Sequence, residues 1–498
     1  MSDRSSAPEE DLPEQMRVRQ EKRRELLARG TPPYVRGFSR THTLAELRTA
    51  YPDLEAGAAT GKTVAIAGRV IFLRNTGKLC FARLRAGDGT ELQAMLSLDR
   101  IGEQSLREWK HLVDIGDHVG IEGEVVSSRR GELSVMTHRW TIVSKALRPL
   151  PVAHKALGDE TRTRQRYADL IVNPAAREMV RVRAAVVRSL RETLHRFGYV
   201  EVETPVLQLV HGGAAARPFH THLNAFDLPV TLRIALELHL KRAVVGGIDK
   251  VYEVGRIFRN EGIDSTHSAE FTMLEAYEAY GDDDTMATLT RGLVLDAARS
   301  AGRTVIPDGR GGEIDLEAPW ARVTVHDAVS DAVGTDVTVD TPAELLLELA
   351  AKHDVHVEPG WDGGQILLEM HEKLVEHTLL APTFVCDYPE SVRPLARPHR
   401  DDPRLTESWD LVVAGVELGV AYSELVDPVI QRERLIAQSL LAANGDPEAM
   451  QLDEDFLRAL EYGMPPTGGM GMGVDRLIML LTGTGIRETI LFPLVKPE

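Results

Sequence analysis

GRIFRNEGIDSTHSAEFTMLEAYEAY, residues 255–280, is the stretch that decides the fold of the larger part of this chain. Its two halves have the pattern of strands joined by a turn. Arg259 and Glu261 share one face of the first strand by simple alternation. The second strand places four further side chains on one face, namely Phe271, Met273, Glu275 and Tyr277. We predict an antiparallel hairpin whose face combines a cation, carboxylates and aromatic rings; a half-buried hairpin with incidental ion pairs is the alternative.

A second hairpin is predicted in WDLVVAGVELGVAYSELVD, residues 409–427. If Ala414 and Gly415 form a two-residue turn, Asp410 and Glu417 become diagonal neighbours on one face. Two close carboxylates repel each other unless a cation lies between them, and Mg²⁺ carried by a nucleotide is the natural candidate.

The same hairpin carries three residues on its opposite face, by alternation along its second strand: Val420, Tyr422 and Glu424. If both faces serve one pocket, this strand requires a bulge or bend near Gly419.

A glycine-rich stretch, GGMGMGVDRLIMLLTG at residues 468–483, lets the backbone approach another group closely and opens a helix behind it. Arg476 lies near the start of that helix, where the helix dipole disfavours a cation. An anionic ligand would explain this arginine; a glycine pair that packs helices, with a surface arginine, is the alternative.

Together, these segments supply two arginines for a polyphosphate, two carboxylates for a metal ion and an aromatic ring for a base. Further carboxylates remain, namely Glu237, Glu275 and Glu424. An anionic pocket beside a nucleotide site suits a substrate with amino groups. The residues therefore predict a nucleotide-dependent enzyme with a cationic co-substrate.

Residues 62–147 have a different character. They contain five short β-rich stretches, with a helical stretch at residues 98–114 after the third. This is the order of an OB barrel, a fold that binds oligonucleotides. A basic helix ending at Gly30 precedes the barrel, and a proline-containing linker follows it at residues 147–151.

The composition argues against a membrane-spanning, a secreted and a disulfide-rich protein. The chain has 498 residues and a formal charge of −17, although the first 150 residues are slightly basic. A local basic region is compatible with nucleic acid binding, and ordinary drift between domains is the alternative. There is no run of 18 apolar residues and no signal peptide, and the only cysteines, Cys80 and Cys386, cannot form a disulfide framework. We expect a cytoplasmic protein that does not enter the membrane.

In this order, three segments resemble the three motifs of class II aminoacyl-tRNA synthetases: FGYVEVETPVL with Pro205, FRNEGIDSTHSAEF, and GMGMGVDR. The family that the chain resembles most is that of bacterial lysyl-tRNA synthetases of the actinobacterial type, which also resembles the synthetase part of proteins that make lysyl-phosphatidylglycerol. The likeness extends over nearly the whole chain, through RQRYADLIVNP, HGGAAARPFHTH, LKRAVVGG, PLARPHR and LEYGMPPT.

The resemblance implies an α+β fold in three parts: an N-terminal helical, basic extension (1–60), an OB-fold anticodon-binding domain (61–150) and a class II catalytic domain (151–498). The catalytic domain would be an antiparallel β-sheet flanked by helices, with a helical insertion at about 280–380. The resemblance further implies a homodimer. It would use ATP, with Mg²⁺, to convert L-lysine into lysyl-adenylate and would then transfer lysine to tRNA(Lys).

The resemblance also implies roles for individual residues in the ATP site. Arg259 would bridge the α-phosphate and the lysine carboxylate, and Arg476 would hold the γ-phosphate. Glu261 and His267 would line the site, and Phe271 would stack on adenine. Asp410 and Glu417 would hold Mg²⁺. Arg259, Glu261 and Arg476 would be the catalytic residues.

Two further sites follow from the same resemblance. The lysine pocket would consist of Arg259 together with Gly213, Glu237, Glu275, Tyr277, Tyr422 and Glu424. In the barrel, Phe81 would stack on an anticodon base, and its polar neighbours would be Arg74, Gln93 and Glu132.

The chain departs from the family pattern at six positions of these segments. Val420 stands where the family usually has Asn, which removes a hydrogen-bonding group from the lysine pocket. Asp410 replaces a usual Glu and is one methylene shorter, and Arg393 replaces a small Ser. The other three departures are Leu236 for Pro, His239 for Tyr and Ser268 for Asn.

Two other functions compete with lysine–tRNA ligation. A paralogue could activate another amino acid or deliver lysine to an acceptor other than tRNA. A catalytically silent dimer that only binds tRNA is the third possibility, and the intact Arg259, Glu261 and Arg476 argue against it.

Overall fold

The structure, a computed structural model, describes residues 13–151, 157–443 and 448–497, so residues 1–12 of the predicted extension lie outside it. The chain forms two compact units, the first ending at Arg177 and the second beginning at Glu178. Each unit has a hydrophobic core of its own.

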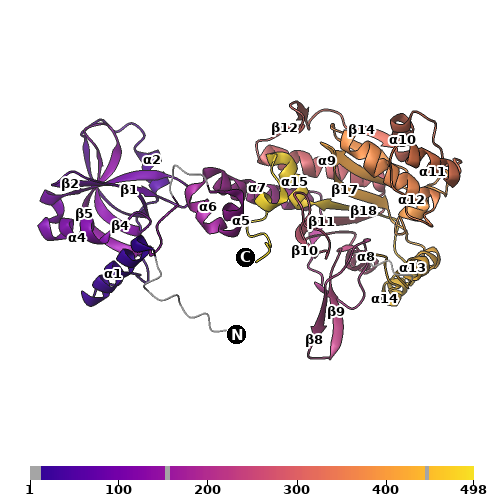
Figure 1. Cartoon of the computed structure of the whole chain (residues 1–498), viewed down its shortest axis with the longest axis horizontal. Coiled ribbons are helices and arrows are strands. Elements are labelled where there is room, and N and C mark those ends of the chain that lie inside the picture. The colour runs from indigo at the N-terminus through magenta and orange to yellow at the C-terminus, as the bar shows by residue number, and fades with distance from the viewer. Residues whose placement is uncertain (1–12, 152–156, 444–447, 498) are drawn as a thin grey trace. The chain divides into compact units, whose positions relative to one another are not determined.

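The first unit is built on a closed five-stranded barrel with the strand order β1-β2-β3-β5-β4 (Figure 1). Its strands are β1 (Ala59–Asn75), β2 (Leu79–Arg85), β3 (Glu91–Ser97), β4 (His118–Ser127) and β5 (Leu133–Ser144). Two helices follow the third strand, α3 (Leu98–Ile101) and α4 (Glu103–Leu112). The predicted OB-fold is therefore confirmed, and the helical stretch is divided at Gly102, whose φ is 79°.

The barrel is filled by every second residue of its strands. Val64 and Ile66 of β1 pack against Ile121 of β4, and Trp109 of α4 completes the same core. The strands β4 and β5 approach closely at Gly123, where a Cβ atom would lie 2.1 Å from the carbonyl oxygen of Met136. Only glycine can occupy that position.

Besides α3 and α4, four further helices belong to the described part of the first unit: α1 (Glu14–Ala28), α2 (Leu44–Ala50), α5 (Asp159–Arg164) and α6 (Arg166–Val172). Leu26 of α1 packs into the barrel core. Arg19 of the same helix is buried and donates hydrogen bonds to the carbonyl oxygens of Ile115 and Ala146, at 2.8 and 3.0 Å. This arginine of the basic helix therefore anchors the helix to the barrel.

The second unit is built on an eight-stranded sheet with the order β14-β15-β16-β17-β18-β11-β10-β6. The strands are β6 (Val200–Glu201), β10 (Lys250–Phe258), β11 (Glu270–Ala279), β14 (Ala321–Thr324), β15 (Thr383–Cys386), β16 (Ser408–Val413), β17 (Val416–Ser423) and β18 (Thr467–Gly473). Neighbouring strands are antiparallel, apart from the parallel pairs at the two edges, β14–β15 and β10–β6. The predicted antiparallel sheet flanked by helices is confirmed.

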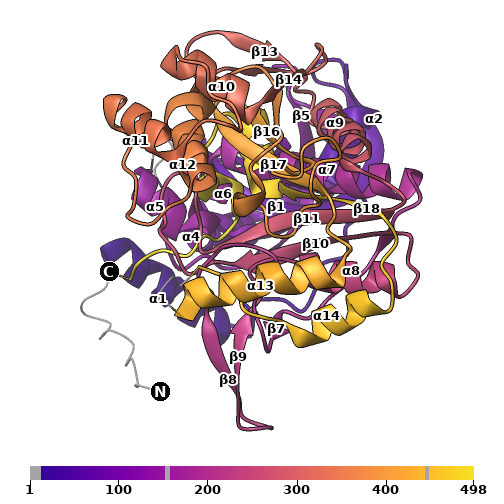
Figure 2. The ribbon, with the colours of Figure 1, turned by 90° about the vertical axis from the view of Figure 1, so that its right-hand side faces the viewer.

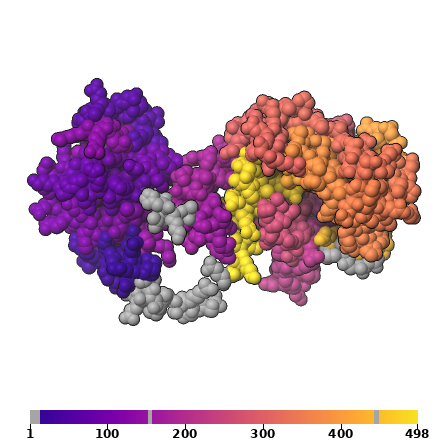
Figure 3. Space-filling view, turned by 45° about the horizontal axis from the view of Figure 1, so that its top comes forward, coloured from indigo at the N-terminus to yellow at the C-terminus, as the bar shows by residue number. Residues whose placement is uncertain are grey.

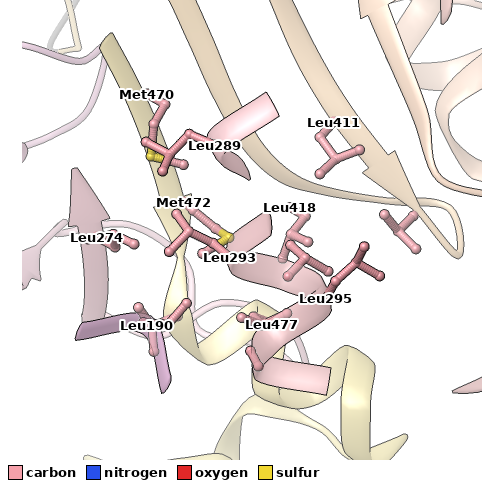
Figure 4. Close-up of a cluster of buried hydrophobic side chains, with 14 of the residues drawn as sticks. Leu190, Leu274, Leu289, Leu293, Leu295, Leu411, Leu418, Met470, Met472 and Leu477 are labelled. Atoms are coloured by element: carbon pink, nitrogen blue, oxygen red, sulfur yellow. The ribbon is translucent and has the colours of Figure 1, made fainter. Parts of the chain in front are cut away.

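Three helices share a core with this sheet: α7 (Pro174–Arg196), α9 (Asp283–Ser300) and α15 (Val474–Thr482). Figure 4 shows Leu274 of β11 and Met470 and Met472 of β18 among leucines of these helices. Since successive side chains of a strand point to opposite faces, the odd-numbered residues of β11 and β18 face the other side of the sheet.

The segment at 280–380 mixes helices with strands. Besides α9 and β14 it contains β12 (Val305–Pro307), β13 (Glu313–Asp315), α10 (Val325–Val333), α11 (Ala343–Lys352), α12 (Gly363–Met370), a π-helical turn (His371–Val375) and a 3₁₀ turn (Glu376–Thr378). The helices α10, α11 and α12 surround a separate apolar cluster, whereas β14 adds an edge strand to the main sheet.

The remaining elements border the sheet. They are a small sheet of β7 (Leu207–Gln208), β8 (His220–Leu223) and β9 (Leu228–Leu232), the helices α8 (Glu237–Val245), α13 (Pro428–Ala443), α14 (Glu454–Glu461) and α16 (Ile486–Thr489), and a 3₁₀ turn (Glu390–Val392). Figure 2 shows the β8–β9 hairpin projecting beyond α13 and α14. The C-terminal residues, yellow in Figure 3, run over the surface of the second unit. No helix within the described ranges is long and apolar enough to cross a membrane.

Candidate active site

One cavity of ≈ 420 Å³ lies on the face of the main sheet that is turned away from the core of α7, α9 and α15. Its walls come from β11, β17, β18, α8 and the loop after β10. Twelve of the thirteen residues that we predicted for the ATP and lysine sites line it: Gly213, Glu237, Arg259, Glu261, His267, Phe271, Glu275, Tyr277, Glu417, Tyr422, Glu424 and Arg476. Asp410 does not.

The floor of the cavity is the central strand β18, which presents only glycines to it. Gly469 lies between Tyr277 of β11 and Tyr422 of β17, and Gly471 lies between Glu275 and Val420. A Cβ atom on Gly469 would lie 2.0 Å from Oε1 of Glu424 and 2.5 Å from the ring of Tyr277. The cavity therefore exists because this strand has no side chains on that face.

The predicted hairpin at 409–427 is present, with a bulge in its second strand. Ala414 and Gly415 have positive φ values of 52° and 74°, and Val412 pairs with Glu417. The register then shifts, because Leu411 pairs with Gly419 and Leu418 has no partner in the pairing. This extra residue turns Glu417 to the same cavity as Val420, Tyr422 and Glu424.

Arg259 is half-buried and lies directly after β10, which ends at Phe258. Its backbone N–H donates to the carbonyl oxygen of Ala269, so it continues the pairing with β11 for one residue. Its guanidinium carbon lies 5.4 Å from the centre of the Phe271 ring. This arrangement brings together a cation and an aromatic ring that could hold a phosphate beside a base.

Glu261 does not share a strand face with Arg259, contrary to our prediction. The strand ends three residues before Glu261, whose carboxylate accepts a hydrogen bond from the backbone N–H of Arg217 at 3.0 Å. Simple alternation fails here because the chain leaves the sheet. Both side chains nevertheless line the cavity.

Arg476 and His267 lie together at the open end of the cavity. Nη1 of Arg476 donates to the carbonyl oxygen of Glu417 at 2.8 Å and lies 3.3 Å from its carboxylate. Nη2 of Arg476 lies 3.4 Å from Nε2 of His267, whose Nδ1 lies 2.9 Å from the carboxylate of Asp264. The cation that the dipole of α15 disfavours is thus balanced by Glu417.

The closed end of the cavity is acidic and contains an ion-pair cluster that our sequence analysis missed. Nζ of the fully buried Lys241 lies 2.5 Å from both Glu237 and Glu424. Glu237 and Lys241 are four residues apart on α8, a spacing typical of helical ion pairs, so the sequence contained a signal for half of this cluster. The contact with Glu424 comes from a distant part of the chain.

Burial and mutual repulsion set the protonation of this acidic end. Burial and the nearby carboxylate of Glu237 raise the pKa of Glu275 to about 7, although it accepts hydrogen bonds from the N–H of Leu236 and the hydroxyl of Tyr277. Burial also raises the pKa of Glu237, while the charge of Lys241 acts in the opposite direction and lowers it. Burial alone would lower the pKa of Lys241, but the carboxylates of Glu237 and Glu424 outweigh it and raise that pKa. The cavity can therefore accept protons or hydrogen bonds from a cationic ligand.

Asp410 is buried on β16, opposite Val420, and is held by an arginine. Its carboxylate pairs with the guanidinium of Arg393, which lies 4.2 Å from the centre of the Tyr388 ring and lines the cavity. One oxygen of the predicted metal ligand is thus taken by a cation of the chain. In the part of the chain that the structure describes, no three His, Cys, Asp or Glu residues come close enough to hold a metal ion by themselves.

The four residues predicted to contact the anticodon belong to the first unit. Arg74 pairs with Phe81 across β1 and β2, with the guanidinium carbon 5.4 Å from the ring centre. Nε2 of Gln93 on β3 donates to the hydroxyl of Ser134, and Glu132 forms an ion pair with Arg48. An aromatic ring and a cation therefore stand side by side on the barrel. Our sequence analysis missed a second such pair next to them, Phe72 and Arg83, which the same alternation could have identified.

Comparison with known proteins agrees with both units. The family model described as tRNA synthetases class II (D, K and N) matches residues 158–496, and the one described as OB-fold nucleic acid binding domain matches residues 64–143. The chain is 57% identical over 490 residues to a lysine–tRNA ligase of Mycolicibacterium gilvum and 54% identical over 496 residues to lysine–tRNA ligase 1 of Mycobacterium tuberculosis, with 98% of each chain covered. It is also 50% identical over 492 residues to the lysylphosphatidylglycerol biosynthesis bifunctional protein of Nocardia farcinica, which covers 98% of this chain and 43% of that protein.

Replacing Lys241 by Met should lower the free energy of unfolding by about 3–5 kcal/mol, because two buried carboxylates would lose their cation. Chemical denaturation measures the change. Lys373→Met is the matched control, since Lys373 is exposed and lies 3.5 Å from Glu369, and it should cost at most about 1 kcal/mol. Equal losses in both variants would contradict a stabilising role for the buried cluster.

Proposed function

Because the chain belongs to the class II tRNA synthetases (D, K and N), we propose that its cavity activates L-lysine with ATP and that the chain is a lysine–tRNA ligase. One observation carries this proposal. The cavity joins a wall of arginines, Arg259 and Arg476, to a buried acidic end formed by Glu275 and its neighbours. The first suits a triphosphate, and the second suits the amino groups of a diamino acid.

The first chemical step is attack of a lysine carboxylate oxygen on the α-phosphorus of ATP, with departure of pyrophosphate. In the proposed pose, Arg259 lies between that carboxylate and the α-phosphate and neutralises charge on both. Arg476 holds the γ-phosphate, while Glu261, His267 and Phe271 surround the rest of the nucleotide. Such a reaction needs positioning and charge neutralisation more than proton transfer by the protein.

The amino acid is held at the acidic end. Glu237, Glu275, Tyr277, Tyr422 and Glu424 would surround its ammonium groups. Gly213 closes the pocket where a Cβ atom would lie 3.0 Å from the Cβ atoms of Ala235 and Glu237, so a larger residue would intrude there. Lys241 already neutralises part of the acidic charge, so the pocket attracts a cation without leaving all its carboxylates unpaired.

A divalent cation, which we expect to be Mg²⁺, accompanies ATP in this proposal and neutralises phosphate charge. Glu417 would hold it, because its carboxylate faces the cavity and its side chain is 41% exposed. Asp410, which we also predicted as a ligand, fits less well because Arg393 takes one of its oxygens.

In the second step, a hydroxyl group at the 3′ end of tRNA(Lys) attacks the carbonyl carbon of the adenylate, and AMP leaves. The barrel of the first unit would bind the anticodon through Arg74, Phe81, Gln93 and Glu132. We further propose that the chain works as a homodimer in the cytoplasm. Exposed apolar side chains at and near the small sheet, Leu207, Leu209 and Phe226, support a second copy as a partner.

Activation of an amino acid other than lysine is the second candidate. Val420 cannot form the hydrogen bonds of an asparagine, and Arg393 adds a cation within the same wall. Val420 and Arg393 both line the cavity, so both changes could alter which amino acid it binds.

The purified chain should catalyse lysine-dependent exchange between ATP and pyrophosphate, and Arg259→Ala should reduce that exchange at least about 100-fold. The reduction follows from losing the cation beside the α-phosphate. Arg256→Ala, which removes an exposed arginine of β10, the strand that precedes Arg259, should keep normal exchange. The assay is run with each of the twenty amino acids and with thermal unfolding as the folding check.

The outcomes separate the candidate functions. Exchange with lysine alone supports the proposal, and exchange with a different amino acid supports the second candidate. A chain without any exchange would be a silent tRNA-binding protein. Near-normal exchange in Arg259→Ala would show that the arginine has no part in activation.

Phe81→Ala should lower kcat/KM for tRNA charging roughly 5- to 150-fold, the equivalent of one lost base stack of about 1–3 kcal/mol. Exchange between ATP and pyrophosphate should not change, since the barrel would contact only the anticodon. Tyr34→Ala removes another exposed ring of the first unit and serves as control. Equal loss in both assays would contradict a separate anticodon module.

Lysine should bind about tenfold more weakly at pH 6 than at pH 8. The ammonium group binds the ionised carboxylate, and a carboxyl group with a pKa of about 7 is mostly ionised at pH 8 and mostly protonated at pH 6. Calorimetric titration of lysine at several pH values measures how the dissociation constant depends on pH. Glu275→Gln should bind lysine weakly and with a smaller dependence on pH, which Glu424 retains because burial raises its pKa to about 8; an unchanged dependence on pH would mean that Glu275 does not contribute.

A further inference from the structure

Arg393 is fixed where it faces both the cavity and Asp410. It follows the 3₁₀ turn that ends at Val392, and its side chain is 14% exposed. Its guanidinium carbon lies 4.2 Å from the ring centre of Tyr388 and 5.9 Å from that of Tyr422. Two aromatic rings thus hold the cation in one place.

The two carboxylates that we expected to share a metal ion have different surroundings. The Glu417 side chain is 41% exposed, lines the cavity and has Arg476 at 3.3 Å. The Asp410 side chain is 9% exposed and pairs with Arg393. Each carboxylate therefore has one guanidinium, and the four charges balance before any ligand enters.

A divalent ion that touched both carboxylates could use only Oδ1 of Asp410, which has no hydrogen-bond partner, because Arg393 occupies the other oxygen. The guanidinium of Arg393, which the Tyr388 ring holds in place, would then lie beside that ion, and like charges repel. Arg393 and Asp410 both depart from the family pattern. The long side chain of Arg393 stands where a small Ser is usual, and it faces Asp410, which is one methylene shorter than the usual Glu.

We propose that Arg393 is a built-in cation that takes the place of one divalent metal ion at Asp410. The enzyme then binds one ion fewer with its nucleotide than it would with a small neutral residue at position 393. Glu417 keeps its role toward the ion that arrives with ATP. This inference rests on the proposed function, in that the cavity binds a nucleoside triphosphate.

The number of Mn²⁺ ions bound per active site tests the inference. It is measured from the electron paramagnetic resonance signal of free Mn²⁺, with saturating α,β-methylene ATP and no lysine. Arg393→Ser should bind one ion more than the unaltered enzyme, whereas Arg393→Lys, which keeps the cation, should not. Arg434→Ser is the matched control, because Arg434 supports the same loop through the carbonyl oxygen of Ala396 and should leave the number unchanged.

A second variant keeps the test decisive if Arg393→Ser folds poorly. Asp410→Asn should leave the number of bound ions unchanged, since Asp410 is not a ligand in this proposal. Loss of one ion in Asp410→Asn would overturn it, as would equal numbers in the unaltered enzyme and a folded Arg393→Ser. Absence of lysine-dependent exchange would contradict the proposed function instead, so the two failures are distinguishable.

Discussion

Because positions 469 and 471 are glycines, β18 has no side chains on the face that forms the cavity floor. Both the acidic end of the cavity and the end with the arginines depend on this open floor. Because β18 lies between β11 and β17, the side chains of those two strands meet above it. Any side chain at Gly469 would collide with Glu424 and Tyr277. The even-numbered residues of the same strand, Met470 and Met472, fill the core below. One strand therefore separates the packed face from the open face.

The second requirement is electrostatic. A pocket for a cationic substrate must bury carboxylates, and isolated buried carboxylates are costly. The chain meets both demands by placing Lys241 between Glu237 and Glu424, while Glu275 remains for the ligand with a pKa raised to about 7. Arginines occupy the opposite end. The cavity is therefore negatively charged at one end and positively charged at the other. The negative end would face the amino groups of the amino acid, and the positive end would face the triphosphate.

Arg393 adds a cation near the middle of this gradient. It faces Asp410 on one side and the ring of Tyr422 on the other, at the wall where Val420 provides no hydrogen bond. Three departures from the family pattern therefore lie together in space, although they are up to 27 residues apart in the sequence. The ion pair between Arg393 and Asp410 accounts for two of these departures, because each residue neutralises the other. Nothing in the structure explains Val420.

The sequence by itself determined everything that depends on local alternation and turn chemistry. The five strands of the barrel, the shared face of Phe271, Glu275 and Tyr277, the turn at Ala414 and Gly415 and the bulge that follows it could all be predicted. These features arise within one strand or one hairpin, where side chains alternate with a period of two residues.

Only the tertiary structure decided which distant groups meet. Lys241 contacts Glu424 across 183 residues, and Arg393 and Asp410 come from a loop and a strand that share no repeating pattern. The strand before Glu261 ends at Phe258, so Glu261 lies outside the sheet, and β14 joins the main sheet from within a mainly helical segment. The order of strands in the sheet sets these contacts, and alternation along a single strand carries no information about that order.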